Sequence, residues 1–457
     1  MATLQSGMMA DAAVDNTVFR KVFRRIMWFI FILLVVSFMD RINIAFAALT
    51  MNKELGLSAA AYGMSFTVFY VTYALFEVPS NLVLVRVGAR LWIARIMVTW
   101  GLASAATMFA TGAWSLYAIR AVVGAAEAGF LPGILLYLTY WFPRSCRARA
   151  NALFIMGIPA TIAIASTLSG FILQMHGFLG LSGWRWLFLL EGVPAVVLGI
   201  LCLFYLDDGP AEARWLSETE KGEIASRLEH DRALEQSTAT QRGIMRQLAS
   251  RNVVLLSLAY FGLVTSLNAN STWVPQIVGG LAHGQSYAVV GMLTALPAIL
   301  TVAVMPLWGA SSDRRNERDW HVRCAMLLAA VGWLLVISFD QPQIRYLGLV
   351  LVSMGSFCAL LTFWTFPASN AILSPEARPA GIALINCAGI GGGSAVGPLV
   401  IGYLKDLTGS FTAGLVYVVA MLIAGLVCMA IVAAHTRVAA TQPLPALPDR
   451  AREGIIG

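Results

Sequence analysis

The sequence predicts an all-α polytopic membrane protein with twelve transmembrane helices. Of the 457 residues, 58% are hydrophobic and 12% are charged, and the mean hydropathy is +0.75. Soluble proteins carry about 25% charged residues, so this chain has too few to cover a soluble globule of its size. Apolar stretches of about 20 residues, the length of a helix that spans a bilayer, recur along the chain. The shorter alternating segments of outer-membrane barrels do not occur in the sequence.

The helices are expected in two groups of six. The spans are predicted at residues 26–50, 60–85, 91–111, 114–141, 149–175, 184–206, 252–280, 288–310, 322–339, 345–373, 379–404 and 410–435. The first stretch is too long for a signal-peptide core and lacks a convincing cleavage site, so we expect it to remain as the first helix. The predicted organisation is an N-terminal segment (1–25), a six-helix bundle (26–206), a central loop (207–251), a second six-helix bundle (252–435) and a tail (436–457).

The basic residues between the spans predict the orientation, because cytoplasmic loops are rich in Lys and Arg. Eighteen lie on one side: Arg20, Lys21, Arg24, Arg25, Arg86, Arg90, Arg95, Arg144, Arg147, Arg149, Arg314, Arg315, Arg318, Arg323, Arg378, Arg437, Arg450 and Arg452. The other side holds Lys53, Arg185, Arg345 and Lys405. We therefore expect a multi-pass protein of the cell inner membrane with both termini cytoplasmic. The net charge of +7 is then a topology signal, and no nucleic-acid partner is expected.

The central loop contains one helix signal. Ser217 and Glu220 have the spacing of a capping box. Four apolar residues on either side of this capping box would share one face of a helix lying on the membrane: Trp215, Leu216, Ile224 and Leu228. We interpret the loop as a linker between the two bundles; a regulatory docking segment is the alternative.

An internal repeat supports two similar halves. The basic loop at 81–90 after the second span corresponds to 309–318 after the eighth, a shift of 228 positions. Residues 148–150 after the fourth span correspond to 377–379 after the tenth, a shift of 229. Two nearly equal shifts of about half the chain predict bundles related by a pseudo-twofold axis.

These motifs resemble the major facilitator superfamily. The resemblance rests on both basic loops and on Arg120-x-x-x-Gly124-x-x-Glu127-Ala-Gly129. Four pieces resemble its anion:cation symporter branch: Met39-Asp40-Arg41-Ile42-Asn43, Glu77-Val-Pro79-Ser80-Asn81, Gly183-Trp184-Arg185-Trp186 and Gly397-Pro398-Leu-Val-Ile-Gly402. The resemblance implies a 6+6 major facilitator fold and transport of organic anions such as tartrate, phthalate or sugar acids. It also implies proton sites at Asp40 and Glu127, with Arg41 and Arg120 near the substrate carboxylate.

Ionisable residues inside the spans are the first functional candidates, because a charge in the bilayer is costly. They are Asp40, Arg41, Glu77, Arg120, Glu127 and Glu191. At 1.5 Å per residue, Asp40 lies roughly 21 Å from the cytoplasmic edge and Arg120 roughly 9 Å from the outer edge, so both fall in one layer. Glu127 lies about two turns further along the helix of Arg120.

This layer of charges suits an organic anion. Guanidinium groups bind carboxylates in a bidentate manner, and carboxyl groups can take up protons that couple transport to a gradient. Three alternatives stay open: a structural salt bridge of Arg120 and Glu127 that only orients the fourth span against the first, a local or packing role for Arg41, and pairing of Glu191 with Arg185.

Uncharged residues complete the predicted substrate site. Tyr73 and Tyr70 lie near the middle of the second span, where a phenol could bind a carboxylate. In the second half we single out Asn268, Trp364 and Asn386, which would recognise hydroxyls or rings of the substrate. Asn386 is preferred for its depth and its resemblance to a polar site of the family. Helix packing or helix–helix hydrogen bonding is the alternative for each of these residues.

Other chemical signals are discounted. The run Gly389-Ile-Gly-Gly-Gly-Ser394 lies within an apolar span without a preceding strand or a Lys, so we expect close helix packing instead of a phosphate loop. The six Cys and five His have no metal-site spacing, and no Walker sequence is present. We expect no enzyme activity, no metal and no cofactor, with a proton gradient as the energy source.

The sequence thus predicts a proton-coupled symporter that imports a small organic anion by alternating access. A dicarboxylate or hydroxy or sugar acid is expected, with tartrate as the first candidate. The expected partners are this anion, protons and the lipid bilayer, and the protein is expected to act as a monomer. The alternatives are an anion exchanger, a proton-coupled efflux transporter and a membrane receptor that binds the substrate without transporting it.

Overall fold

The computed structural model describes residues 17–236, 247–315, 317–367, 372–374 and 377–441. The first sixteen residues of the predicted N-terminal segment and the tail beyond residue 441 lie outside this range. All regular elements in the described residues are helices. Eleven are long and apolar enough to cross a membrane, and Gly157–Leu173 is a shorter apolar stretch. The prediction of an all-α fold with many spans is confirmed.

Among the described residues, each half contains seven α-helices, and the second half also contains a π-helical segment. The first seven are α2 (Thr17–Glu54), α3 (Ala59–Val87), α4 (Ala89–Ala106), α5 (Ala113–Glu127), α6 (Phe130–Trp141), α7 (Arg144–Leu173) and α8 (Gly183–Tyr205), with 3-10 turns at Thr107–Phe109, Phe178–Gly180 and Pro210–Glu212. After α9 (Glu218–Gln236) follow α11 (Arg251–Leu281), α12 (Tyr287–Arg315), α13 (Arg318–Ser338), α14 (Pro342–Phe363), α15 (Arg378–Ala388), the π-helix η4 (Gly389–Ser394), α16 (Val396–Thr408) and α17 (Thr412–Thr441). Two expected spans are each divided: 114–141 into α5 and α6, and 379–404 into α15, η4 and α16.

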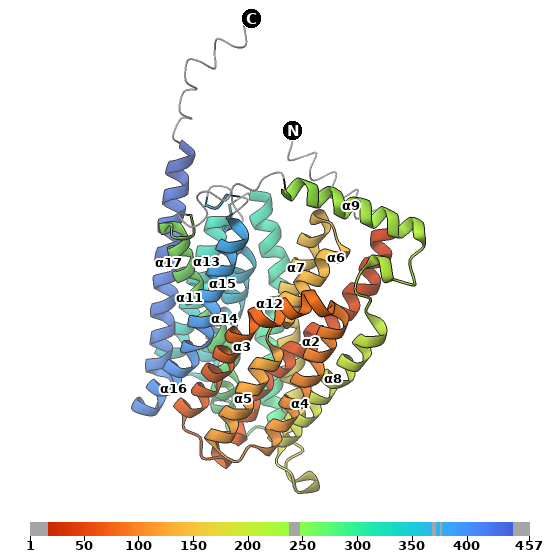
Figure 1. Ribbon diagram of the computed structural model, residues 1–457. Coiled ribbons are helices and arrows are strands. Elements are labelled where there is room, and N and C mark those ends of the chain that lie inside the picture. Colours follow the sequence, from red (N-terminus) through yellow and green to blue (C-terminus); the bar gives the residue numbers. More distant parts are fainter. Residues whose placement is uncertain (1–16, 237–246, 316, 368–371, 375–376, 442–457) are drawn as a thin grey trace, which may run out of the picture.

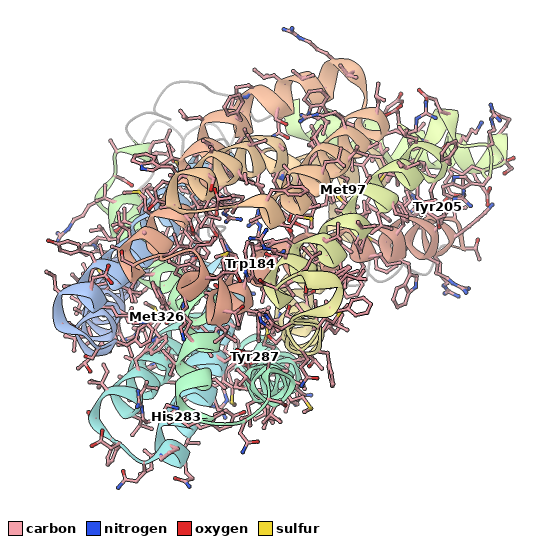
Figure 2. All side chains as sticks on the ribbon, turned by 90° about the horizontal axis from the view of Figure 1, so that it is seen from below. Met97, Trp184, Tyr205, His283, Tyr287 and Met326 are labelled. Carbon is pink, nitrogen blue, oxygen red and sulfur yellow. The ribbon has the colours of Figure 1, made fainter. Side chains whose placement is uncertain are left out.

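The helices run between two faces of the molecule. We call the face with the start of α2, the end of α17 and α9 the terminal face, and the opposite face, with the α2–α3 and α11–α12 connections, the distal face (Figure 1). Figure 2 views the molecule along the helices. Met97 and Tyr205 of the first half lie to one side, Met326 and His283 of the second half to the other, and Trp184 and Tyr287 between them.

The two halves are held together near the distal face by close backbone approaches. At the contact of α3 with α16, a Cβ on Gly63 would come within 2.5 Å of the Pro398 carbonyl oxygen. At the contact of α7 with α12, a Cβ on Gly170 would come within 2.6 Å of the Tyr287 carbonyl oxygen. Small residues allow such approaches between membrane helices, where dispersion contacts drive association.

The two buried cores also show that the halves are joined near the distal face. One core joins distal residues of the first half, such as Phe46, Tyr62 and Trp184, with the second half. The other core is made entirely of residues between Val18 and Leu228, and includes the terminal parts of α2, α3 and α8 together with α9. A continuous core across both halves therefore exists on the distal side, which closes that side.

The helix α9 docks on the first bundle at the terminal face. Its capping box forms, since the Ser217 amide donates to Glu220 at 2.8 Å and the Glu220 amide donates to the Ser217 hydroxyl at 3.3 Å. The hydrogen bonds from Lys21 and from the Ser217 amide hold the pKa of Glu220 below its usual value. Ile224 and Leu228 are buried in the core that also contains the start of α2. The expectation that this apolar face rests on the membrane is wrong, because protein side chains already cover it.

Candidate functional site

The guanidinium of Arg41 on α2 is paired with Glu127, the last residue of α5. Nε of Arg41 donates to Oε1 of Glu127 at 2.8 Å, and a terminal nitrogen lies 2.6 Å from the same oxygen. The Ser37 hydroxyl is 3.5 Å from Oε1, whereas Oε2 is buried without a hydrogen-bond partner. The buried ring of Tyr73 lies 5.5 Å from the Arg41 guanidinium and completes its surroundings. This pair joins the first and fourth predicted spans, so for Glu127 the alternative of a structural salt bridge between these spans is present in the structure, whereas Arg120 takes no part in it.

Asp40 faces α4, away from the neighbouring arginine. Trp100 donates to its Oδ2 at 2.7 Å, Asn43 donates to Oδ1 at 2.9 Å, and the Ser104 hydroxyl also donates to Oδ1. The side chain is 2% exposed. Adjacent residues of a helix point about 100° apart, so Asp40 and Arg41 contact different helices. Sequence reasoning missed Trp100 and Ser104, although their four-residue spacing on one face of an apolar span was a usable signal.

Arg120 on α5 is the buried cation that lacks an anionic partner. It is 4% exposed, and its guanidinium carbon lies 4.4 Å from the ring centre of Phe69 and 5.6 Å from that of Phe66. Nε has no hydrogen-bond partner, and no ion pair to Arg120 occurs among the described residues. Asp40 and Glu127 act on it electrostatically without contacting it. Burial of an unpaired charge is costly, so this geometry favours an anionic ligand.

The fourth span breaks immediately after Glu127. Ala128 leaves the helical region, and Gly129 has φ 87°, which favours glycine. A Cβ at Gly129 would also collide with the Ser80 hydroxyl of α3. The Glu127 carboxylate therefore lies at a helix C-terminus, where partial negative charge disfavours an anion and the Arg41 guanidinium compensates. Gly129 followed by Pro132 was the sequence signal for this break.

A polar connection joins the two halves near the middle of the spans. The Tyr70 hydroxyl on α3 donates to Oδ1 of Asn268 on α11 at 3.3 Å. Nδ2 of Asn268 in turn donates to the Ser394 hydroxyl of η4 at 2.9 Å and to the Val264 carbonyl at 3.0 Å. The structure thus brings together Tyr70 and Asn268 from the predicted site, whereas Tyr73 lies in the Arg41 surroundings.

The glycine run of the eleventh span forms the π-helix η4. A Cβ on Gly389 would collide with the Tyr260 ring, one on Gly392 with Phe261, and one on Gly393 would come within 2.9 Å of Thr265 N. The expectation of close helix packing is confirmed, with α11 as the partner. The π-helix itself was missed; π-bulges lie frequently at functional sites, and this one presents Ser394 to Asn268.

Asn386 and Trp364 lie elsewhere in the second half. Asn386 on α15 is half-buried, and its side-chain amide has no hydrogen bond to another described residue. Trp364 follows α14 and packs edge-on against Tyr260, with ring centres 4.8 Å apart. Among the described residues, neither side chain forms a hydrogen bond, ion pair or ring contact with Arg120 or with the Arg41–Glu127 pair. An amide without a partner remains available for ligand contact, while Trp364 has a packing role in this conformation.

The remaining buried acid is separate from these groups. Oε1 of Glu191 accepts a hydrogen bond from Ser169 at 2.8 Å, and Oε2 has no partner. Arg185 instead lies 3.4 Å from Glu54 and donates to the Met108 carbonyl at 3.0 Å. Pairing of Glu191 with Arg185 is therefore wrong. No group of His, Cys, Asp and Glu among the described residues is arranged to hold a metal ion.

Comparison with known proteins supports a transport function. The family model of the Major Facilitator Superfamily matches residues 30–386 and 280–453. A protein of Agrobacterium vitis named "Putative tartrate transporter" is 45% identical over 413 residues, which cover 90% of this chain and 94% of that protein. A "Quinolone resistance transporter" of Acinetobacter baumannii is 35% identical over 435 residues, covering 94% and 98%.

A solved structure shows the same fold. A bacterial homolog of the human lysosomal transporter Spinster, in an inward-facing and unoccupied conformation, superposes with a TM-score of 0.74. The superposition covers 95% of this chain and all of that chain at 16% identity. The chain therefore belongs to the Major Facilitator Superfamily and is a multi-pass membrane transporter of a small organic substrate, not an enzyme.

Proposed function

We propose that the protein imports a small hydroxylated dicarboxylate, with tartrate as the first candidate, by proton-coupled symport. The observation that carries this proposal is the buried Arg120 guanidinium, which lacks an anionic partner among the described residues. A carboxylate of the substrate would form a bidentate pair with it. The aromatic faces of Phe66 and Phe69 beside Arg120 restrict the site to small ligands. The 45% identical relative named as a tartrate transporter supports this substrate class.

The Arg41–Glu127 pair supplies a coupling mechanism. While Glu127 is ionised, it holds the Arg41 guanidinium through two close contacts to one oxygen. Protonation of Glu127 removes its charge, and Arg41 then becomes free to bind the second carboxylate of the substrate. Proton and anion would therefore bind together, which is the requirement for symport.

Asp40 is proposed as a second proton site. Its carboxylate accepts hydrogen bonds from Asn43, Trp100 and Ser104, the last two on α4. Protonation would weaken these contacts and loosen α2 against α4. A movement of α2 would in turn displace Arg41, so both acids would act on the same arginine.

The proposed setting is the inner membrane with the terminal face in the cytoplasm. The basic residues of the loops at that face support this orientation. The core that joins both halves on the distal side then closes the outer face, so the conformation is inward-facing. We further propose that one copy of the chain suffices for transport, because the predicted site lies within a single chain.

Uptake of radiolabelled tartrate into proteoliposomes tests the proposal. An imposed gradient that is acid outside should drive accumulation above equilibrium, and a protonophore should abolish it. Arg120→Ala should weaken binding at least about 30-fold, because truncating one partner of a buried charge pair costs roughly 2–5 kcal/mol. Undiminished tartrate binding by Arg120→Ala would refute the role of Arg120.

Glu127→Gln separates coupling from binding. This variant should bind tartrate and exchange it across the membrane but should not concentrate it in response to the pH gradient. Glu191→Gln is the matched control, since it neutralises another buried acid of the same half that contacts Ser169 and no arginine. A Glu127→Gln protein that still concentrates tartrate with the gradient would overturn the coupling role.

Proton-coupled efflux is the second candidate, because a 35% identical relative is named a quinolone resistance transporter. Gradient-driven movement of norfloxacin out of the cytoplasmic side, with no tartrate uptake, would favour it. In the unmodified protein, tartrate exchange that does not depend on the pH gradient would indicate an exchanger. Tartrate binding without any flux would indicate a receptor.

A further inference from the structure

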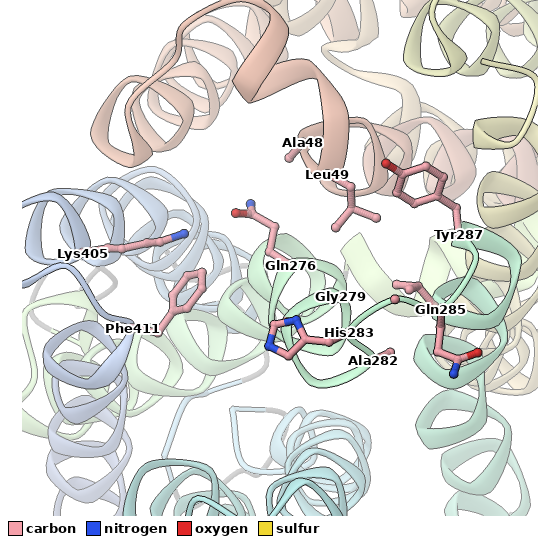
Figure 3. Close-up of a pocket in the computed structure, with 13 residues that line it drawn as sticks. Ala48, Leu49, Gln276, Gly279, Ala282, His283, Gln285, Tyr287, Lys405 and Phe411 are labelled. Carbon is pink, nitrogen blue, oxygen red and sulfur yellow. The ribbon is translucent and has the colours of Figure 1, made fainter. Parts of the chain in front are cut away.

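The distal face contains a pocket of about 350 Å³ between the two halves (Figure 3). Its walls come from α2, the end of α11, the α11–α12 connection, the start of α12, α16 and Phe411, which precedes α17. Its volume lies within the roughly 300–1,000 Å³ that is typical of small-molecule sites. The predicted substrate residues do not line it, so it is distinct from the Arg120 site.

Lys405 supplies a positive charge to this pocket. Its Nζ lies 3.9 Å from the ring centre of Phe411 and 5.7 Å from that of Trp273. No carboxylate of a described residue forms an ion pair with it. The adjacent Asp406 accepts instead from the backbone amides of Ala59 and Ala60. The aromatic faces stabilise the ammonium but leave its hydrogen-bond donors to be used by a ligand.

Besides Lys405, the polar side chains that line the same space are those of Gln276, His283, Gln285 and Tyr287. The Gln276 amide is buried and interacts with the Tyr62 hydroxyl, but its Nε2 forms no well-aligned hydrogen bond among the described residues. Figure 3 shows the Lys405 amine and the Gln276 amide ending near each other, with the His283 ring on one side and Leu49 on the other. The described residues that line the pocket include no Asp or Glu. A cation, an amide and an imidazole form a donor set for a small organic anion.

An aromatic wall separates this pocket from Arg120. The Trp273 ring lies beneath Lys405 and contacts Tyr62 at 5.1 Å between ring centres; Tyr62 contacts Phe66 at 5.2 Å. Phe66 in turn lies 5.6 Å from the Arg120 guanidinium. Tyr62 and Trp273 are fully buried and Phe66 is 5% exposed, so a ligand in the pocket cannot reach Arg120 in this conformation.

We propose that the distal pocket is a recruitment site for a small organic carboxylate, held by Lys405 and Gln276 before the aromatic wall opens toward Arg120. The inference rests on the proposed import function and adds a second binding site to it. The pocket lies on the distal face, so the site acts on substrate arriving from that face. Substrate that enters from the terminal face reaches the Arg120 site without passing Lys405.

Transport kinetics measured in both directions test this inference. Lys405→Gln should raise the KM for tartrate uptake from the distal side about threefold to tenfold, because a charge-assisted contact in a partly solvated pocket is lost. The maximal uptake rate and the KM for efflux from the terminal side should stay unchanged. The maximal efflux rate should fall by the same factor, because without a gradient the ratio of maximal rate to KM is equal in both directions. Lys405→Arg should restore the uptake KM, because it restores the positive charge. The unchanged efflux KM of Lys405→Gln shows that this variant folds.

Lys53→Gln is the matched control. Lys53 is an exposed lysine at the distal end of α2 that does not line the pocket. If Lys53→Gln raises the uptake KM as much as Lys405→Gln, the effect is one of general surface charge and the inference is overturned. An unchanged KM in Lys405→Gln, or an equal change in both directions, would also overturn it.

A binding measurement separates this inference from the proposed function. Saturation-transfer difference NMR with tartrate on the Arg120→Ala protein should show residual weak binding, which Arg120→Ala combined with Lys405→Gln should lose. Lys405-dependent binding in a protein that does not transport tartrate would refute the proposed function and retain the pocket. Transport that depends on Arg120, with no Lys405-dependent binding, would retain the function and refute the pocket.

Discussion

The distal contact between α3 and α16 offers a quantitative test of how the transporter stays closed on that side. The Asp406 carboxylate of α16 accepts from the backbone amides of Ala59 at 2.9 Å and Ala60 at 2.8 Å. These amides belong to the first turn of α3, so the carboxylate caps the N-terminus of a helix in the other half. The perturbation is Asp406→Asn, which removes the charge and nearly preserves the shape.

The expected loss follows from the two hydrogen bonds and their exposure. A hydrogen bond to a charged group contributes about 1.5–3 kcal/mol when water is excluded. The Asp406 side chain is exposed, so water competes for it and we expect about 1 kcal/mol for the pair. This corresponds to about a fivefold shift from the distal-closed toward the distal-open state, because 1.4 kcal/mol is about tenfold.

Hydrogen–deuterium exchange of the protein in nanodiscs measures this shift. Peptides that contain residues 59–66 and 395–402 should exchange about fivefold faster in Asp406→Asn, since opening exposes the seam between α3 and α16. Asp340→Asn is the control, because Asp340 is an exposed acid in the α13–α14 connection of the same face. Unchanged exchange in Asp406→Asn, or equal acceleration in both variants, would refute the reasoning.

Three further substitutions test the local geometry. Gly129→Ala should destabilise the protein by at least about 2 kcal/mol and lower its Tm by several degrees, because it forces an alanine to φ 87° against the Ser80 hydroxyl. Gly112→Ala is the control, since Gly112 has open space around it, and its Tm should not change. Equal Tm values for the two variants would contradict this reasoning. Ser104→Ala removes a hydrogen bond from α4 to Asp40 on α2, so the protein should lose about 1.5–3 kcal/mol of stability and its Tm should fall by several degrees; an unchanged Tm would contradict the role of this contact. Trp215→Ala removes the stacking of Trp215, just before α9, on Trp141 of α6, whose ring centres are 5.7 Å apart. Limited proteolysis near α9 should then become several-fold faster. Unchanged cleavage would show that this contact does not hold α9 in place.

Much of the fold followed from local properties of the sequence. The apolar stretches identified the spans, and the glycine run of the eleventh span was correctly assigned to close packing. The capping box at Ser217 was also visible, because its two residues are three positions apart. The partner of the α9 face was not visible: an apolar helix face can be buried by lipid or by protein, and here the start of α2 covers it.

The candidate site shows the same division. Depth along a helix placed Asp40 and Arg120 in one layer, but depth does not determine which way a side chain points. The 100° turn between successive residues directs Asp40 toward α4 and Arg41 toward Glu127. Arg120 consequently has no anionic partner among the residues that the structure describes, an outcome that depends on how three helices are rotated against one another.

By itself, the sequence determined that the chain crosses a membrane many times and that a few costly charges concentrate in its first half. These conclusions hold because hydrophobic length and the free energy of burying a charge depend on composition and position along the chain. Only the tertiary structure decided which acid pairs with which arginine, which face is closed, and where Lys405 and Gln276 from different helices meet. Helix rotation and register arise from contacts between residues far apart in the sequence, which no local pattern encodes.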